Sequence, residues 1–341
     1  TLWIDPQEIA NSKKVKKSEI ISEFRKIAGG NLRDDFEKLF EKTSTRYQVI
    51  GTKLSLKQAN AIREKKFHGV GFTAETRRVY PEGNLAAQVL GFVNDNGGNY
   101  GIEQAMNKEL TGTDGYKKIT TDAFNQVIEV GSENIEKPAV NGKNIALSID
   151  RNIQARVEKV LKSQMESKGM KNGSVLVMNP KNGKIMAMAN YPTYNPADYG
   201  KVEKSSVYNN NTATMAYENG SVIKSFTMAT GINEGVASPS TRYNNTDSIR
   251  IEDIVIQNAV LGHTGSITLQ TAMNYSLNTG MVTIGKLLGG GSLNSTARDK
   301  IYDYFHNRFG LGQETGIEVL ESKGLLVSPK KAEGNAVRYS N

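Results

Sequence analysis

The sequence predicts an α+β protein of two domains, in which the second domain has a mainly antiparallel sheet flanked by helices. The chain of 341 residues is long enough for about two domains of roughly 150 residues each. Its first 140 or so residues mix short helical and strand patterns, and the residues that follow open with a strand, a helix and a hairpin. Because a hairpin joins antiparallel neighbours, we expect an antiparallel sheet.

Short helices and strands alternate in the first region. Apolar residues repeat at helical spacing from Ile20, and Gly29 and Gly30 should end that helix. Ser55 and Gln58 form a capping-box pattern, which marks the start of another helix. Helices are expected over residues 20–27, 32–40, 55–64 and 102–110, and strands near 47–50, 116–120 and 126–130.

A polar stretch at residues 132–142, which contains Pro138, predicts a linker or domain edge. The two domains are therefore placed at residues 1–140 and 141–341. In the second domain, Asp150 is expected to cap a helix. The other expected elements there are a strand over 145–149, the body of that helix to about residue 165, and hairpin strands over 174–178 and 184–189.

Composition narrows the chemistry that the chain can perform. It has no cysteine, which excludes disulfides, thiolate nucleophiles, iron–sulfur clusters and cysteine-based zinc sites. It has three histidines, so both a histidine-rich metal site and a Ser–His–Asp triad are disfavoured. The histidines are His68, His263 and His306.

The net charge of +8 raises the affinity for polyanions. The charge is scattered, however, and we interpret its densest run, Lys13 to Lys17, as a solvated face in preference to a binding surface. Aromatic residues do not interleave with it, so nucleic-acid binding is not predicted. No stretch of 18 apolar residues occurs, so no transmembrane helix is predicted either. Because the chain opens at Thr1 without Met, we expect it to be a piece of a longer protein.

The most informative segment is NGSVIKSFTMATGINEG, residues 219–235. Ser221 and Lys224 are three residues apart, which places both side chains on one face of the helix that we expect to begin at Ser221. A lysine held among apolar neighbours has a lowered pKa, and its neutral amine can activate a hydroxyl as a nucleophile. The neighbours expected to be mostly buried are Val222, Ile223, Phe226, Met228, Ala229 and Ile232.

The Ser-x-x-Lys pattern by itself is weak support for this chemistry. It occurs again at Ser328 and Lys331, where proline and charge indicate an exposed loop. Taken alone, the tetrapeptide at residues 221–224 favours a serine that caps a helix and a lysine that reaches solvent.

A second segment, NYSLNTGM at residues 274–281, favours the catalytic interpretation. One helix should end near Tyr275 and another should begin near Thr279, which places Ser276 and Asn278 on a tight connection between two apolar helices. Polar groups in such a connection must be satisfied internally or point into a cleft.

With SVIK followed by SLN in this order, the chain resembles the penicillin-binding protein transpeptidase family. Two further segments, RRVYPEGNLAAQVLGFV and YGIEQAMNKELTGTDG, are similar to the pedestal domain of class B penicillin-binding proteins. Two others, SVLVMNPKNGKIMAMANYPTYNP and GLGQETGIEVL, resemble parts of the transpeptidase domain. The resemblance implies an elongated mixed α/β pedestal of the dimerisation type over residues 1–140 and a penicillin-binding transpeptidase domain over 141–341.

The resemblance assigns roles to four residues at matching motif positions. Ser221 resembles the nucleophile that becomes acylated, and Lys224 resembles the base that activates it. Ser276 resembles the residue that relays a proton toward the leaving amine, and Asn278 resembles the residue that binds the substrate amide. Neither a cofactor nor a metal is implied. The acidic residues outside these motifs are expected in a solvated loop; they include Asp247, Glu252 and Asp253.

One motif of the family is missing. The sequence contains no Lys-Thr-Gly or Lys-Ser-Gly, and the nearest string is ETG at residues 314–316. In the family this motif lies on a strand that lines the cleft, so we expect a transpeptidase domain that is C-terminally incomplete, with the third motif downstream of Asn341. We also expect that the chain without that strand acylates poorly.

The implied function is that of a peptidoglycan D,D-transpeptidase, which crosslinks stem peptides through a serine acyl-enzyme and is inhibited covalently by β-lactams. The implied setting is bacterial cell-wall synthesis, in cell division or in cell shape, with division or elongation membrane proteins as partners. The expected location is the extracytoplasmic side of the cytoplasmic membrane, with a single-pass anchor upstream of the chain. Three alternatives stay open: a serine β-lactamase, a β-lactam sensor and a non-catalytic cell-wall scaffold.

Overall fold

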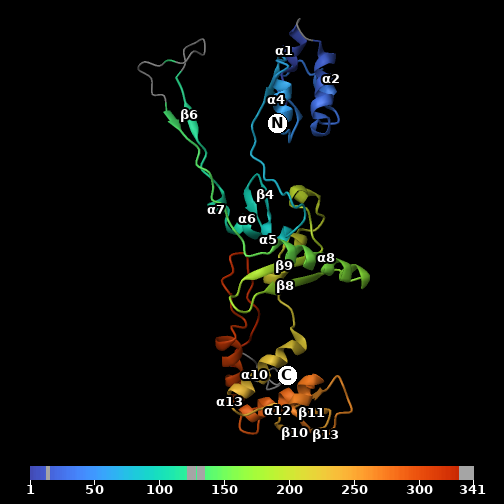
Figure 1. Ribbon diagram of the computed structural model, residues 1–341, viewed down its shortest axis with the longest axis vertical. Helices are drawn as coiled ribbons and strands as arrows, with labels where there is room; N and C mark the ends of the chain where they lie inside the picture. Colours follow the sequence, from blue (N-terminus) through green and yellow to red (C-terminus); the bar gives the residue numbers. More distant parts are fainter. Residues whose placement is uncertain (13–15, 121–127, 129–134, 330–341) are drawn as a thin grey trace. The chain divides into compact units, whose positions relative to one another are not determined.

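Figure 1 shows the computed structural model of the chain, which describes residues 1–12, 16–120, 128 and 135–329. By packing, the chain divides into two compact units, Thr1–Val79 and Tyr80–Asn341. This division rests on packing alone and does not test the predicted domain boundary near residue 140, which stays a prediction. Among the helices of the described residues, none combines the length and the apolar character that a bilayer crossing requires.

A three-stranded antiparallel sheet forms the centre of the first unit. The strand order is β2-β1-β3, so the N-terminal strand pairs with both of the others. The buried stripe of α2 covers a core whose fully buried side chains include Leu2, Ile4, Phe24 and Ile50. The elements are β1 (Leu2–Ile4), α1 (Pro6–Asn11), α2 (Lys17–Ala28), η1 (Gly29–Asn31), α3 (Phe36–Leu39), β2 (Gln48–Gly51), α4 (Leu56–Arg63) and β3 (Val70–Phe72).

The helix boundaries of this unit test the sequence signals. Ser55 Oγ accepts from Gln58 N at 3.2 Å, and Gln58 Oε1 accepts from Ser55 N at 2.9 Å, so the predicted capping box is confirmed at the start of α4. The helix α2 ends where the two glycines begin η1, also as predicted. The helix expected over 32–40 is reduced to α3, because Arg33 N donates to Ile50 O at 2.9 Å and the start of that range pairs with β2.

The second unit opens with short helices and a small hairpin. The helix expected over 102–110 is interrupted at Met106, whose φ of −110° is not helical, so two helices stand where one was predicted. The elements are α5 (Ala87–Leu90), β4 (Phe92–Asn94), β5 (Gly97–Asn99), α6 (Gly101–Ala105) and α7 (Asn107–Leu110).

A two-stranded ribbon of β6 (Tyr116–Lys118) and β7 (Ile135–Lys137) follows. The strand near 116–120 is confirmed, and the strand expected over 126–130 lies outside the described residues apart from Ile128. β7 lies inside the stretch 132–142, so the prediction of a linker is wrong for these three residues. Their side chains are exposed while their backbone pairs with β6. A strand with no buried face needs no apolar residues, so the polar composition gave no signal for it.

A helix packed on a hairpin comes next, and Figure 1 shows α8 (Arg151–Ser167) beside β8 (Gly173–Met178) and β9 (Ile185–Tyr191). The helix begins where the sequence predicts, because Asp150 Oδ1 accepts from the backbone N of both Asn152 and Ile153 at 2.9 Å. The two strands form the expected antiparallel hairpin.

Residues 145–149 form no strand, although they alternate as one would. A side chain from α8 occupies the edge of β9 instead: Gln154 Nε2 donates to Met188 O and Gln154 Oε1 accepts from Met188 N, both at 2.8 Å. The segment before the helix meets β9 through a bond from Asp150 N to Met186 O at 2.9 Å. The predicted strand is therefore wrong, and the segment meets the start of β9 through a side chain, since Ser148 Oγ donates to Ile185 O at 2.6 Å.

The remaining elements combine helices with two antiparallel strand pairs, β10 with β13 and β11 with β12. Within them, α12 packs against α10, α11 and α13, and its Met281 and Ile284 are fully buried. The predicted α+β class with antiparallel sheets is confirmed. The elements are η2 (Pro196–Lys201), η3 (Ser205–Tyr208), α9 (Asn211–Thr214), η4 (Gly220–Ile223), α10 (Lys224–Asn233), β10 (Arg242–Asn245), β11 (Ser248–Ile251), β12 (Ile254–Gln257), β13 (Gly265–Thr268), α11 (Leu269–Asn274), α12 (Asn278–Leu288), α13 (Ser295–Asp303) and η5 (Tyr304–Arg308).

Candidate active site

The segment that carries Ser221 begins with a tight turn. Gly220 has a φ of +63°, a left-handed conformation that glycine adopts readily, and the next residues form the 3-10 helix η4. The α-helix α10 begins only at Lys224, whose backbone N donates to Ser221 O. The predicted helix does begin here, and its first turn is a 3-10 turn that continues into α10. In a 3-10 turn the side chains at i and i+3 eclipse, which keeps the serine and the lysine on one face.

Fewer apolar side chains of this segment are buried than the sequence predicts. Three that were expected inside are exposed: Val222, Ala229 and Ile232. The buried positions follow helical spacing: Lys224, Thr227, Met228, Thr230 and Gly231. This face packs so closely on α12 that a Cβ on Gly231 would lie 2.7 Å from Ile284 Cγ2. The helix α10 is thus buried along the one face that carries the lysine.

The Lys224 side chain is buried, with 5% of its surface exposed, and its amine reaches the connection between α11 and α12. Its Nζ donates to Ser276 O at 2.7 Å, to Ser276 Oγ at 3.1 Å and to Asn278 Oδ1 at 2.5 Å. These three residues form the lysine cluster. The fold has brought together side chains that are 52 and 54 positions apart in the sequence.

Burial lowers the pKa of the Lys224 amine, because desolvation penalises its charged form. As an ammonium, Lys224 has three N–H groups for its three acceptors. As a neutral amine, it can donate to the two carbonyl oxygens while its lone pair accepts from the Ser276 hydroxyl. Both protonation states find partners in the lysine cluster, so this nitrogen can take up and release a proton without rearrangement.

Ser276 lies in strained backbone at the end of α11, with a φ of +54°. Its N donates to Met273 O at 3.2 Å, and Leu277 N donates to Ala272 O at 2.8 Å, which are the two bonds of a Schellman motif. Glycine is usual at this position because it has no Cβ to clash. A serine here costs stability, and it brings a hydroxyl to the buried amine. Strain of this kind at a polar cluster is a mark of functional sites.

Asn278 is the first residue of α12, and both ends of its amide are fixed. Its Oδ1 accepts from Lys224, and its Nδ2 donates to Gln257 O at 2.7 Å. The amide therefore has one orientation, with its oxygen toward the amine and its nitrogen toward β12. A fixed, half-buried amide is suited to bind another amide.

The Ser221 hydroxyl makes no hydrogen bond to the lysine cluster, although Ser221 lies one turn before Lys224. Its side chain is exposed, and its hydroxyl makes no hydrogen bond to the residues that the structure describes. The structure thus brings three of the four predicted site residues together and leaves the fourth open to solvent. A nucleophile has to be accessible to its substrate, and catalytic hydrogen bonds often tighten only in the substrate complex.

The sequence analysis missed a buried polar network behind α12. Asp247, which was expected in a solvated loop, accepts from Gly262 N at 2.7 Å and from the side-chain amides of Asn245 and Asn258. These hydrogen bonds, the one from Gly262 foremost, hold the pKa of the Asp247 carboxyl below its usual range. Asp247 does lie in the turn between β10 and β11, but it is half-buried, whereas Glu252 and Asp253 are exposed as expected. A usable signal was the Asn-x-Asp spacing, because Asp247 N donates to Asn245 Oδ1 as in an Asx turn.

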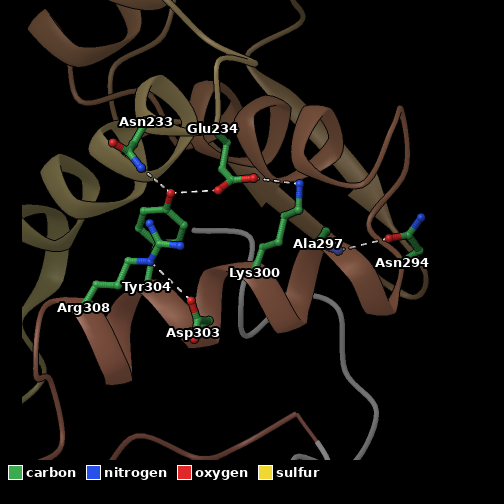
Figure 2. A network of polar contacts seen from close by, with 8 residues as sticks. All are labelled: Asn233, Glu234, Asn294, Ala297, Lys300, Asp303, Tyr304 and Arg308. Carbon is green, nitrogen blue, oxygen red and sulfur yellow. Dashed lines mark hydrogen bonds and ion pairs between the residues drawn. The ribbon is translucent and has the colours of Figure 1, made fainter.

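Polar contacts also fix the far end of α10, as Figure 2 shows. Tyr304 OH accepts from Asn233 Nδ2 at 2.5 Å and donates to Glu234 Oε1 at 2.8 Å. Lys300 Nζ lies 2.8 Å from Glu234 Oε2, and its hydrogen bond is the first cause that lowers the pKa of that carboxyl. The Arg308 guanidinium lies over the Tyr304 ring, 4.0 Å from its centroid. The helix that begins at the buried lysine is thereby tied to α13 and η5.

Two family models match the chain, and together they account for most of its length. Residues 1–147 match the "Penicillin-binding Protein dimerisation domain", and residues 173–340 match the "Penicillin binding protein transpeptidase domain". The chain belongs to the class B penicillin-binding protein family. This confirms the resemblance inferred from the SVIK and SLN segments.

Named relatives of this penicillin-binding protein extend over almost all of the chain. The peptidoglycan D,D-transpeptidase FtsI of Escherichia coli (strain K12) is 27% identical over 335 residues, which cover 97% of this chain and 54% of that protein. Stage V sporulation protein D of Bacillus subtilis (strain 168) is 29% identical over 336 residues, which cover 96% of this chain and 49% of that protein.

The fold is shared with a crystal structure of Penicillin Binding Protein 2X from Streptococcus thermophilus. That structure superposes with a TM-score of 0.73 at 22% identity, covering 100% of this chain and 52% of the other. The chain spans about half the length of each of these relatives.

Proposed function

We propose that this penicillin-binding protein is a peptidoglycan D,D-transpeptidase that crosslinks stem peptides through an acyl-enzyme on Ser221. The observation that carries the proposal is the buried Lys224 amine, held by Ser276 and Asn278 one turn after that serine. A desolvated amine can take the proton of a hydroxyl that comes within hydrogen-bonding distance in the substrate complex, and Lys224 follows Ser221 by one turn. All four residues lie in the stretch that matches the transpeptidase domain, and the name of the Escherichia coli relative supports the choice of substrate.

In the acylation step, Ser221 Oγ attacks the carbonyl carbon of the penultimate D-Ala of a stem peptide. Its proton passes to the neutral amine of Lys224. The tetrahedral intermediate collapses and breaks the D-Ala–D-Ala amide bond, and the leaving amine receives a proton through the Ser276 hydroxyl. Asn278 binds an amide of the donor peptide and holds its carbonyl in line with the serine.

In the second step, an amine of a neighbouring stem peptide attacks the ester carbonyl. That amine loses a proton to the lysine cluster, the ester bond breaks, and Ser221 leaves with a hydroxyl proton. The product is an amide crosslink, and the enzyme returns to its starting state. A β-lactam follows the first step only: its ring amide opens on Ser221, and the leaving amine stays attached to the acyl group.

Mass spectrometry of the full-length protein after penicillin treatment tests the proposal. We expect one added drug mass on the peptide that contains Ser221, and none in Ser221→Ala. Ser225→Ala is the matched control, because Ser225 is an exposed serine of the same segment, with its Oγ donating to Val222 O at 2.8 Å. With uncrosslinked peptidoglycan as substrate, D-Ala release and crosslinking should depend on Ser221 as well. Labelling that persists in Ser221→Ala would overturn the site assignment.

The fate of the labelled protein separates the alternatives. A transpeptidase should keep the penicilloyl ester for many minutes, because its cleft favours an amine over water as the second nucleophile. Turnover of the ester within seconds would identify a serine β-lactamase. Stable labelling without D-Ala release from peptidoglycan would identify a sensor, and absence of labelling would identify a scaffold.

The proposal extends to the organisation and location of the protein. It places a pedestal at residues 1–140 and the transpeptidase domain at 141–341, on the extracytoplasmic side of the cytoplasmic membrane with a single-pass anchor. Division or elongation membrane proteins are proposed as its partners. The support is the substrate class, because peptidoglycan lies outside the membrane. Protease added to intact spheroplasts should digest the protein; protection until lysis would contradict this location.

A further inference from the structure

A buried polar network lies directly behind the lysine cluster. Its most buried members are Asn245, at 1% exposed, and Asn258 and Thr279, at 3% each. Asn245 ends β10, Asn258 follows β12, and Thr279 is the second residue of α12. Together with Asp247 these residues form the amide network. Buried amides and hydroxyls are costly unless they are hydrogen-bonded, so the network holds its strands and helix in one arrangement.

Asn258 uses both ends of its side-chain amide in this network. Its Oδ1 accepts from Thr279 N at 3.1 Å and from Thr279 Oγ1 at 3.2 Å. Its Nδ2 donates to Asn245 Oδ1 at 3.2 Å and to Asp247 Oδ1 at 3.3 Å. The single hydroxyl proton of Thr279 is shared with Asn245 Oδ1, which lies nearer at 2.8 Å, so the backbone bond from Thr279 N is the firm one on the Asn258 oxygen. The orientation of this amide is therefore fixed by its surroundings.

The start of α12 needs an external partner of this kind. Its N-cap residue is Leu277, which has no side-chain oxygen to accept from the first free N–H groups of the helix. The Asn258 oxygen accepts from Thr279 N and thus acts as the cap, supplied from β12 instead of from the residue before the helix. The position of the first turn of α12 depends on this contact.

Asn258 is also linked to the lysine cluster, because the residue before it bonds to Asn278. Asn278, which directly precedes Thr279, donates from Nδ2 to the carbonyl oxygen of Gln257, which directly precedes Asn258. Residues 257 and 258 are therefore each hydrogen-bonded to the matching residue of the pair 278 and 279. On its other side, the Asn278 oxygen lies 2.5 Å from Lys224 Nζ.

From this geometry we propose that Asn258 is a positioning residue for the acylation centre: it caps α12 from β12 and so fixes where Asn278 and Ser276 meet the amine of Lys224. This inference rests on the proposed function for its kinetic consequence. Its structural consequence, the place of Asn278 relative to Lys224, does not depend on that function.

Asn258→Ala tests the proposal in the full-length protein. Removal of the cap and of two amide donors should let the first turn of α12 shift, and a misplacement of about 1 Å at a reacting centre costs on the order of a hundredfold in rate. We expect the rate constant of penicillin acylation to fall by about 10-fold to 100-fold, with the non-covalent dissociation constant changed less. An unchanged rate in a folded Asn258→Ala protein would overturn the proposal.

A matched control separates positioning from a general loss of stability. Asn190 is 5% exposed, and its amide bonds to Asn210 Oδ1 at 3.0 Å and to Asn211 N at 2.9 Å, with no bond to the lysine cluster among the described residues. Asn190→Ala should lower the melting temperature by a similar amount and leave the acylation rate within about twofold. Equal slowing in both variants would assign Asn258 a merely structural role and refute the proposal.

A crystal structure of Asn258→Ala gives a readout that is independent of activity. We expect the distance between Lys224 Nζ and Asn278 Oδ1 to exceed 3.5 Å or to become variable between copies, and an unchanged lysine cluster would contradict the proposal. If Asn258→Ala does not fold, Asn258→Ser carries the same test, because its oxygen is one bond too short to reach Thr279 N. If the wild-type protein is not acylated on Ser221, the proposed function fails while this structural test still decides the positioning role.

Discussion

The left-handed backbone of Ser276 allows a test of two separate claims: that a side chain at this position strains the backbone, and that the Ser276 hydroxyl is needed for acylation. Ser276→Gly and Ser276→Ala both remove the Oγ that lies 3.1 Å from Lys224 Nζ, and they differ only in whether a Cβ remains at a φ of +54°. A left-handed L-residue costs roughly 1–2 kcal/mol, and the greater freedom of unfolded glycine offsets about 0.4–1 kcal/mol of this. The glycine variant should therefore be more stable than the alanine variant by about 0.5–1 kcal/mol.

Thermal unfolding of the two variants measures this difference. For a domain of this size, 1 kcal/mol shifts the melting temperature by roughly 2–4 °C, so Ser276→Gly should melt about 1–4 °C above Ser276→Ala. Penicillin acylation should be slowed in both, by about 100-fold or more, because both lack the proton relay. If the alanine variant is as stable as the glycine variant, the left-handed strain is not real. If the glycine variant acylates like the wild type, the hydroxyl is not a relay.

Three further predictions follow from local contacts. Because burial lowers the pKa of Lys224, the acylation rate should rise with pH through a pKa below the ordinary lysine value of about 10.4. Between these two pKa values the unfolded state binds one more proton than the folded state, so folding stability should also rise with pH. A rate that rises only above about pH 10 would contradict this. Glu234→Gln removes the ion pair with Lys300 and should lower stability by up to about 1 kcal/mol at neutral pH. Because the Glu234 pKa is depressed in the folded state, this difference should shrink as the pH falls below the ordinary glutamate pKa and be lost as it falls through the lower folded-state pKa; melting curves at several pH values test this. Ser55→Ala should cost about 1 kcal/mol of helix stability and speed hydrogen exchange over Leu56–Arg63, and unchanged exchange would show that the capping box is not stabilising.

The features that the sequence predicts well are those set by bonds within three residues. Ser55 and Asp150 each bond to backbone N–H groups two or three positions on, so the residue and its partner can be recognised together in the sequence. The hairpin of β8 and β9 is likewise local, since its strands are joined by one short turn. Distant chain segments have little influence on such elements.

The predictions that fail depend on partners that spacing does not reveal. The alternation at 145–149 is that of a strand, and yet the segment bonds to β9 through the Ser148 hydroxyl and Asp150 N and forms no ladder there. The strand β7 is concealed by polar residues, because its ribbon is held by backbone pairing without burial on either face. The helix expected from Ser221 is present, but Val222 in its first turn is exposed, which shows that apolar composition does not decide burial at a helix end.

The site itself was predictable only in part. Order and family resemblance singled out Ser221, Lys224, Ser276 and Asn278, and the contact of the last three could be inferred from no spacing rule, because more than 50 residues separate them. Asn258 carries no signal at all in the sequence. A buried amide that caps a distant helix looks the same as any polar residue after a strand.

Two features of this site are unfavourable for stability, and hydrogen bonds at the two helices that carry the site offset them. A buried amine and a left-handed serine are both unfavourable, and each could relax if its helix were free to shift. The helix α10 is prevented from shifting at its far end by Glu234 and Asn233, whose bonds to Tyr304 and Lys300 join it to α13 and η5 (Figure 2). The helix α12 is held at its near end by the cap that Asn258 supplies. Weakening either tie should therefore let the lysine cluster move before the domain unfolds. The rate of acylation should then fall more clearly than the melting temperature does.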